Sequence, residues 1–207
     1  MQKKNIEQNS GNIAHDFNNI LTIIHTCSQL VLAEISDNKK ACKYMDKILM
    51  ACEKASALID VHFPTTKRNE KRDSRARKPV CSKNKIVLLV DDEKDLLNTV
   101  QLLLEHIGYT VFAFENPVSA LLEFKKNPEK FDIVIADVAM PEMDGKQLAQ
   151  QIKEIRNDLP ILISSGDNNH LSEREMNQLG INGFLMKPFL KKDLSESIQQ
   201  ALSVSDK

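Results

Sequence analysis

The sequence predicts a helical hairpin followed by an α/β domain with a doubly wound parallel sheet. Three observations support this fold class. Apolar residues recur at helical spacing over 12–35 and 39–62, strands alternate with helices from residue 85, and a basic polar segment separates the two parts. We therefore divide the 207-residue chain into a hairpin over 1–63, a flexible basic linker over 64–84 and an α/β domain over 85–207.

Both hairpin helices carry apolar residues at heptad spacing. The first helix has an apolar stripe made of Ile13, Phe17, Ile20, Ile24, Cys27 and Val31. The second has Met45, Ile48, Cys52, Ala55 and Ile59. A hairpin this small cannot bury both of its apolar faces alone, so we expect a homodimer in which two copies form a four-helix bundle. Packing of the hairpin on the downstream domain is the less favoured alternative, because a long polar linker intervenes.

The linker is strongly basic, although the net charge of the chain is only −1. Between Pro64 and Lys85 there are nine lysines and arginines against two acids. Because the segment lacks apolar periodicity, we interpret it as a solvated tether. Contact with nucleic acid or acidic lipid is the alternative. We expect neither partner, since no aromatic residue beyond Phe63 could stack on bases.

Cysteine usage and hydropathy predict a cytoplasmic protein. The four cysteines show neither C-x-x-C pairing nor metal-ligand spacing, which favours a reducing compartment. No apolar run approaches the roughly 18 residues of a membrane span. The polar N-terminal segment is unlike a signal peptide.

Five strand–helix repeats are predicted from residue 85 onward. The strands cover 86–90, 109–114, 132–136, 161–164 and 183–186. The helices cover 93–107, 118–126, 146–156, 172–179 and 190–202. The run from Ile86 to Val90 is apolar throughout, which is typical of a strand buried on both faces. Ligands of such sheets bind at the carboxyl ends of the strands.

Acids, a hydroxyl and a lysine fall at these strand ends. Asp91 and Asp92 follow the first strand, Asp137 the third, Ser164 the fourth and Lys187 the fifth. Crowded carboxylates raise one another's pKa unless a cation neutralises them, and Mg²⁺ prefers such oxygen ligands. We therefore predict a Mg²⁺ site where a carboxylate accepts a phosphoryl group. Ser164 would offer its hydroxyl to a phosphoryl oxygen, and Lys187 would offer its charge to the same group or to Asp137.

Residues 85 to about 204 resemble a response-regulator receiver domain. The matching features are Asp91-Asp92, the segment from Asp137 to Gly145, Ser164 and Lys187-Pro188-Phe189. The resemblance implies a flavodoxin-like five-stranded fold and Asp137 as phosphoacceptor. It also implies Mg²⁺ bound by Asp92, Asp137 and the Ala139 carbonyl, with help from Asp91. Ser164 and Phe184 would be switch residues, and the Lys187–Pro188 bond would be cis. A degenerate receiver that is not phosphorylated is disfavoured, since no acid is replaced.

A histidine in the first helix lies outside the apolar stripe. His15 falls at heptad position f within Ala14-His15-Asp16-Phe17-Asn18-Asn19, with Asn19 on the same side. Asp16 could accept the imidazole proton and leave one ring nitrogen to attack phosphorus. The remaining histidines are expected to be ordinary surface residues: His25, His62, His106 and His170.

Residues 11 to about 63 resemble the dimerisation and histidine-phosphotransfer (DHp) domain of sensor histidine kinases. The resemblance implies His15 as phosphoryl carrier, Asp16 as its acid partner and Asn19 as a residue tied to phosphatase chemistry. An ATP-binding domain follows the hairpin in that family. Here only about 20 residues separate hairpin and receiver, and the chain has no Gly-rich phosphate loop. We therefore expect no autonomous ATP-dependent kinase activity.

Together these patterns predict a two-component phosphorelay protein that passes a phosphoryl group between His15 and Asp137 or partner proteins. It would be a histidine phosphotransferase and, through Asn19, an aspartyl-phosphate phosphatase. Its partners would be a cognate histidine kinase or other phosphodonor and a downstream receiver or effector. The alternative is a dimeric response regulator whose hairpin serves only dimerisation or partner binding and whose receiver signals through protein contacts.

Overall fold

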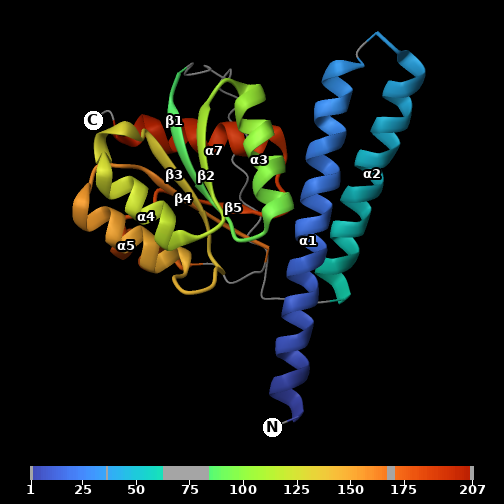
Figure 1. The fold of residues 1–207 in the computed structure, drawn as a ribbon. Helices are drawn as coiled ribbons and strands as arrows, with labels where there is room; N and C mark the ends of the chain where they lie inside the picture. Colours follow the sequence, from blue (N-terminus) through green and yellow to red (C-terminus); the bar gives the residue numbers. More distant parts are fainter. Residues whose placement is uncertain (1, 36, 63–83, 167–170, 206–207) are drawn as a thin grey trace.

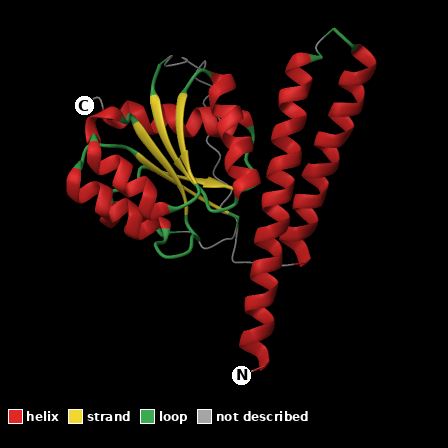
Figure 2. Ribbon diagram, in the orientation of Figure 1, coloured by secondary structure: helices red, strands yellow, loops and turns green. Residues whose placement is uncertain are grey.

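The chain forms a long two-helix hairpin beside an α/β domain (Figures 1 and 2). The computed structural model describes residues 2–35, 37–62, 84–166 and 171–205. The predicted linker therefore lies outside the described residues, except for Asn84.

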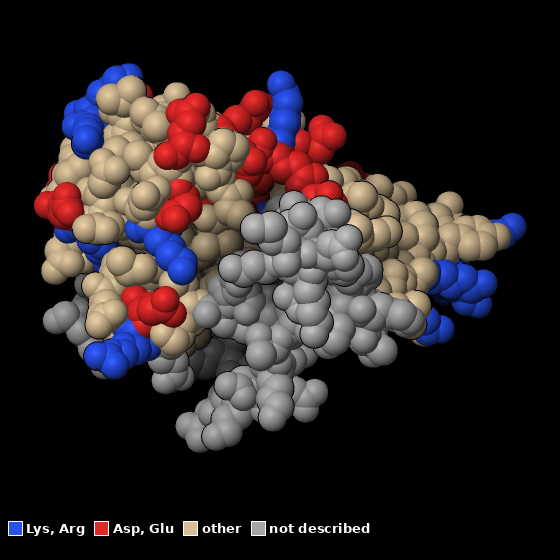
Figure 3. Space-filling view, turned by 90° about the horizontal axis from the view of Figure 1, so that it is seen from below, with Lys and Arg blue, Asp and Glu red and all other residues tan. Residues whose placement is uncertain are grey.

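The hairpin consists of α1 (Gln2–Glu34) and α2 (Lys39–His62), which confirms both predicted helices. The side-chain oxygen of Asn38 accepts a hydrogen bond of 3.1 Å from the Ala41 amide and so caps the start of α2. α1 begins ten residues before its predicted start. The prediction missed these first turns because they are polar and carry no apolar periodicity. The lysines of α2 are exposed, and Figure 3 shows basic side chains on the outer side of the hairpin.

The α/β domain contains a five-stranded parallel sheet in the order β2-β1-β3-β4-β5. The strands are β1 (Ile86–Val90), β2 (Thr110–Phe114), β3 (Ile133–Asp137), β4 (Ile161–Ser165) and β5 (Gly183–Met186). The helices are α3 (Lys94–Ile107), α4 (Pro117–Lys126), α5 (Gly145–Ile155), α6 (Glu173–Leu179) and α7 (Lys191–Ser205), with a short 3₁₀ turn η1 (Pro128–Lys130). The predicted fold class is confirmed. The strand order reverses between β1 and β3, which places Asp91 and Asp137 at neighbouring strand ends.

Each face of the sheet has its own apolar core. On one face Leu88, Val134 and Ile161 pack with residues of α4, α5 and α6. On the other face Leu89 and Ile135 pack with residues of α3 and α7. Each fully buried aliphatic side chain contributes about 1.5–3 kcal/mol. Alternate residues of one strand contribute to opposite cores, which explains why β1 is apolar throughout and β3 is apolar up to its last residue.

The hairpin packs on the α/β domain, which is the alternative that the long polar linker had made less favoured. α1 runs beside α3, as Figure 1 shows. Ile23 and Leu30 of α1 pack against the α3–α7 core, and the Lys191 amide donates a hydrogen bond of 3.1 Å to Gln29 Oε1. We call this the receiver-facing side of α1; it comprises Asn18, Asn19, Ile23, Gln29 and Leu30. Its mixed polar and apolar composition gave no heptad signal.

The apolar stripe of α1 lies on a different side of the helix and is exposed. Phe17 and Ile20 are each 50% exposed, and Ile13, Ile24 and Val31 are also exposed. A row of exposed large apolar side chains on one helix is unusual for a surface that stays in water. The stripe therefore fits a surface that another helix covers.

The prediction that His25 is a surface residue is wrong, because its side chain is only 4% exposed. It lies in α1 between Ile23 and Gln29 of the receiver-facing side, near Glu53 of α2 and Asp193 of α7. His106 is exposed as predicted, whereas the side chains of His62 and His170 lie outside the described residues. In the parts of the chain that the structure describes, no helix combines the length and hydropathy needed to cross a bilayer.

Candidate functional site

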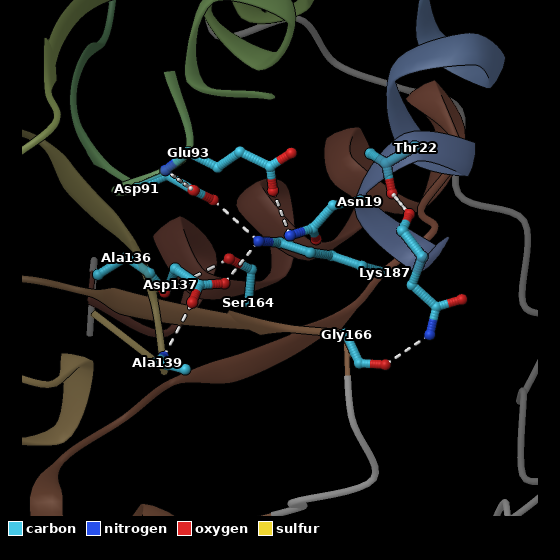
Figure 4. A network of polar contacts seen from close by, with 11 residues as sticks. Asn19, Thr22, Asp91, Glu93, Ala136, Asp137, Ala139, Ser164, Gly166 and Lys187 are labelled. Carbon is cyan, nitrogen blue, oxygen red and sulfur yellow. Dashed lines mark hydrogen bonds and ion pairs between the residues drawn. The ribbon is translucent and has the colours of Figure 1, made fainter. Parts of the chain in front are cut away.

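The carboxyl ends of the strands bring two acids and a lysine into direct contact. Lys187 Nζ lies 2.8 Å from Asp91 Oδ2 and 2.5 Å from Asp137 Oδ1. All three side chains are buried, and Figure 4 shows the lysine reaching between the two carboxylates. The parallel register of β1, β3, β4 and β5 produces this arrangement, because each residue follows or ends its own strand. We call Asp91, Asp92, Asp137 and Lys187 the acid site.

Burial and charge act in opposite directions on these groups. Burial raises the pKa of Asp91, and the nearby Asp137 raises it further, while Lys187 partly offsets both. Burial alone would lower the pKa of Lys187, but the two carboxylates outweigh it and raise this pKa above its ordinary value. The lysine is therefore a permanent cation at neutral pH. It can attract an anionic group that approaches Asp137.

The loop after β3 holds the second oxygen of Asp137. The Ala139 amide donates a hydrogen bond of 2.8 Å to Asp137 Oδ2. The loop then turns back so that the Gly145 amide reaches the Val138 carbonyl at 3.0 Å. A Cβ atom at Gly145 would lie 2.3 Å from the Asp137 carbonyl oxygen, so this close approach requires glycine. The predicted carbonyl ligand role of Ala139 stays a prediction.

The remaining receiver positions lie around the acid site. Ser164 pairs with Asp137 in the register of β3 and β4, and its buried hydroxyl lies 3.5 Å from the Ala136 carbonyl oxygen. Phe184 of β5 is half-buried against the core beneath α4, α5 and α6. The Lys187–Pro188 bond is cis, as expected. The switch roles of Ser164 and Phe184 stay predictions.

The chemistry of the acid site fits Mg²⁺, although the arrangement shown uses lysine as its cation. Asp91, Asp92 and Asp137 are hard oxygen donors on adjacent strand ends, and Asp92 is exposed to solvent. Among the described residues, no three acidic, histidine or cysteine side chains lie in a metal-binding arrangement. Asp91 and Asp137 instead share the Lys187 ammonium. Mg²⁺ binding to this donor set would require the carboxylates to turn toward it.

The receiver-facing side of α1 reaches the edge of the acid site. Asn19 donates a hydrogen bond from its amide nitrogen to the Glu93 carboxylate, and Asn18 Nδ2 lies 2.6 Å from the Gly166 carbonyl oxygen. Glu93 is joined to the acid site because its backbone N–H donates to Asp91 Oδ1 at 3.0 Å. Figure 4 shows the Asn19 amide nitrogen directed at the Glu93 carboxylate. The polar side chains of α1 therefore lie at the rim of the strand-end site.

Sequence reasoning identified Asn19 but missed Glu93, Asn18 and Gly166. Glu93 directly follows the acid pair and had been interpreted as the start of a helix; in the structure it precedes α3. Asn18 stands beside Asn19, so the Asn-Asn pair was the available signal. The side chain of His15 lies outside the described residues, although its backbone belongs to α1, and Asp16 is exposed.

The sheet order, the two faces of helices and the strand-end acids define a receiver of the CheY-like class. Residues 87–199 match the family model of the response regulator receiver domain. The chain therefore belongs to that family, which serves two-component signalling. This match begins after the hairpin, so the DHp-like identity of the hairpin belongs to the proposals below.

Relatives include both regulators and kinases. The chain is 36% identical over 119 residues to the transcriptional regulatory protein GlrR of Escherichia coli, covering 58% of this chain and 26% of GlrR. It is 31% identical over 147 residues to the sensor histidine kinase GacS of Pseudomonas protegens, covering 69% of this chain and 15% of GacS. The chain thus spans about a quarter or less of the length of these two relatives.

Solved structures agree with the fold. A response regulator receiver domain protein from Clostridium thermocellum is 29% identical, with a TM-score of 0.53 over 59% of this chain and 97% of that one. The response regulator TrrA of Thermotoga maritima, solved with Mg²⁺ and BeF, is 26% identical, with a TM-score of 0.52 over 57% of this chain and 99% of TrrA. Both likenesses concern the receiver-sized part of the chain.

Proposed function

We propose that this protein is a phosphorelay component that passes a phosphoryl group between His15 and Asp137, or between these residues and partner proteins. The observation that carries the proposal is the docking of α1 at the acid site, through Asn18 to Gly166 and Asn19 to Glu93. His15 precedes these asparagines by three and four residues on the same helix. Residues at that spacing share a helix face, and this spacing supports the proposal that His15 is presented toward the receiver.

The proposed transfer step is an in-line displacement at phosphorus. A carboxylate oxygen of Asp137 forms the new bond to phosphorus while the bond to one imidazole nitrogen breaks. The other ring nitrogen carries a proton throughout, so the products are a neutral imidazole and an aspartyl phosphate. The reverse step exchanges the two roles. Lys187 is placed to offset charge on the phosphoryl oxygens, and Asp16 would hold the imidazole tautomer. Mg²⁺ held by Asp91, Asp92, Asp137 and the Ala139 carbonyl would supply further positive charge there.

We further propose that the phosphoryl group comes from another protein. The segment between hairpin and receiver is about 20 residues long and basic, too short for a nucleotide-binding domain. A cognate histidine kinase would be the donor, and a receiver or effector protein would be the downstream partner. The protein would then act as a histidine phosphotransferase in the cytoplasm.

The exposed apolar stripe of α1 supports a homodimer. It lies on a different side of the helix from Asn18 and Asn19, so both surfaces could be used at once. This stripe also favours the second candidate function, a dimeric response regulator whose hairpin only joins two receivers. Full signalling by a His15→Ala variant would select that second function.

The first experiment is incubation of the full chain with acetyl phosphate and Mg²⁺, followed by mass spectrometry of its peptides. We expect a phosphoryl group on Asp137 that depends on Mg²⁺ and is absent in Asp137→Asn. Asp158→Asn, which removes an exposed acid, should label as the wild type does. With ATP and Mg²⁺ alone no label should appear. Lack of label on Asp137 in the wild type would refute the receiver part of the proposal.

A further inference from the structure

Glu93 joins the hairpin to the acid site, and among the described residues of the receiver no hydrogen bond to its carboxylate is found. It occupies the cap position before α3, yet its carboxylate does not cap that helix. The carboxylate instead accepts the hydrogen bond from the Asn19 amide nitrogen, while the Glu93 backbone N–H donates to Asp91. One residue therefore fixes both an asparagine of α1 and an acid of the site.

This contact determines the orientation of the Asn19 carboxamide. The nitrogen and oxygen of a carboxamide lie in one plane, so a partner that holds the nitrogen also places the oxygen. Asn19 is 1% exposed, which restricts its rotamers further. A buried, oriented carboxamide at the rim of the acid site could position a water molecule, because its oxygen accepts a hydrogen bond.

We propose that Glu93 is a positioning residue for hydrolysis of the aspartyl phosphate on Asp137, acting through Asn19. The inference rests on the proposed function, in which Asp137 carries the phosphoryl group. In the step, the oxygen of a water molecule forms a bond to phosphorus and the bond between phosphorus and the Asp137 oxygen breaks. The products are the Asp137 carboxylate, inorganic phosphate and one proton released to solvent. Glu93 holds Asn19 so that the carboxamide oxygen aligns the attacking water.

The test is the decay of phosphoryl label on Asp137 in the full chain, loaded with acetyl phosphate and Mg²⁺ and then freed of donor. Loss of one hydrogen bond to a charged group corresponds to roughly a tenfold or greater rate effect. We expect Glu93→Ala to slow the decay about tenfold. Asn19→Ala should be equally slow, and the double variant no slower, because the two residues act as one unit.

Conservative and control variants separate positioning from general loosening of the hairpin. Glu93→Gln keeps an acceptor for the Asn19 amide and should decay at close to the wild-type rate. Glu115→Ala removes an acid at the next strand end, which pairs with Lys94, and should also behave as the wild type. Asn18→Ala removes the Gly166 contact while Glu93 still holds Asn19, so its effect should be much smaller than that of Glu93→Ala.

Several results would overturn the role of Glu93 while leaving the proposed function intact. These are wild-type decay in Glu93→Ala, wild-type decay in Asn19→Ala, additive slowing in the double variant, or an Asn18→Ala effect as large as that of Glu93→Ala. Failure of Asp137 to load in the wild type would instead refute the proposed function itself. The two failures are therefore distinguishable.

Discussion

At the scale of single residues, Lys187 holds two buried carboxylates together. Its ammonium contacts both Asp91 and Asp137, and its side chain is 1% exposed. Removing one member of a buried ion pair leaves an uncompensated charge, which typically costs about 3–5 kcal/mol. The lysine thus contributes to stability in the same position from which it would act on a phosphoryl group.

We predict that Lys187→Met lowers the free energy of unfolding of the receiver by about 3–5 kcal/mol. Urea unfolding at neutral pH measures the loss. Lys192→Met is the matched control, because Lys192 is exposed and forms a surface pair with Glu196; its effect should stay within about 0.5 kcal/mol. A loss below about 1 kcal/mol in Lys187→Met would show that the buried pair matters little.

His25 gives the hairpin a predicted pH dependence. Burial lowers its pKa, and this outweighs the opposite effects of Glu53 and Asp193. Within the part of the chain that the structure describes, its Nδ1 atom has no hydrogen-bond partner. The pKa of a histidine in the unfolded chain is about 6.5. As the pH falls below that value, the unfolded chain binds the proton before the folded chain does, so the folded state loses stability. The loss continues until the lower folded-state pKa is reached.

We therefore predict that the thermal midpoint falls as the pH is lowered from about 7 to about 5.5. His25→Gln should show a weaker pH dependence over this range, whatever its absolute stability. His106→Gln, in which an exposed histidine is replaced, should keep the wild-type dependence. Equal pH dependence in His25→Gln and the wild type would assign the effect to other groups.

At the scale of elements, two sides of α1 have different surroundings. The receiver-facing side contacts the α3–α7 core, Glu93 and Gly166, whereas the apolar stripe stays exposed. Because the two sides point in different directions, dimerisation through the stripe would leave the receiver contact in place. A hairpin in a dimer could therefore present His15 to a receiver while its apolar residues are buried in a shared core.

We predict that the protein is a dimer and that the double change Phe17→Glu, Ile20→Glu makes it monomeric. Both residues are half exposed in the single chain, so the charges would be costly only where a second copy covers them. Sedimentation equilibrium measures the mass. Leu122→Glu changes an equally exposed leucine on α4 and should remain dimeric. A wild-type protein that sediments as a monomer would contradict the predicted dimer.

At the scale of the whole molecule, the sequence predicted the receiver well and the docking poorly. Its central strands β1, β3 and β4 are mostly apolar and buried on both faces, so their positions and the acids at their ends could be predicted from local pattern alone. The hairpin–receiver contact depends on Asn18, Asn19 and Gln29, which are polar residues without periodicity. Polar contacts between distant segments leave no local signal. For the same reason the sequence did not show that His25 is buried or that the Glu93 carboxylate contacts α1.

The account depends most on exchange of a phosphoryl group between the hairpin and the receiver. The direct measurement is peptide mapping of the full chain after Asp137 has been loaded by acetyl phosphate. We predict a phosphoryl group on His15 in the wild type, none on His15 in Asp137→Asn, and undiminished loading of Asp137 in His15→Gln. A wild-type chain in which Asp137 is fully loaded and His15 never becomes labelled would contradict the account.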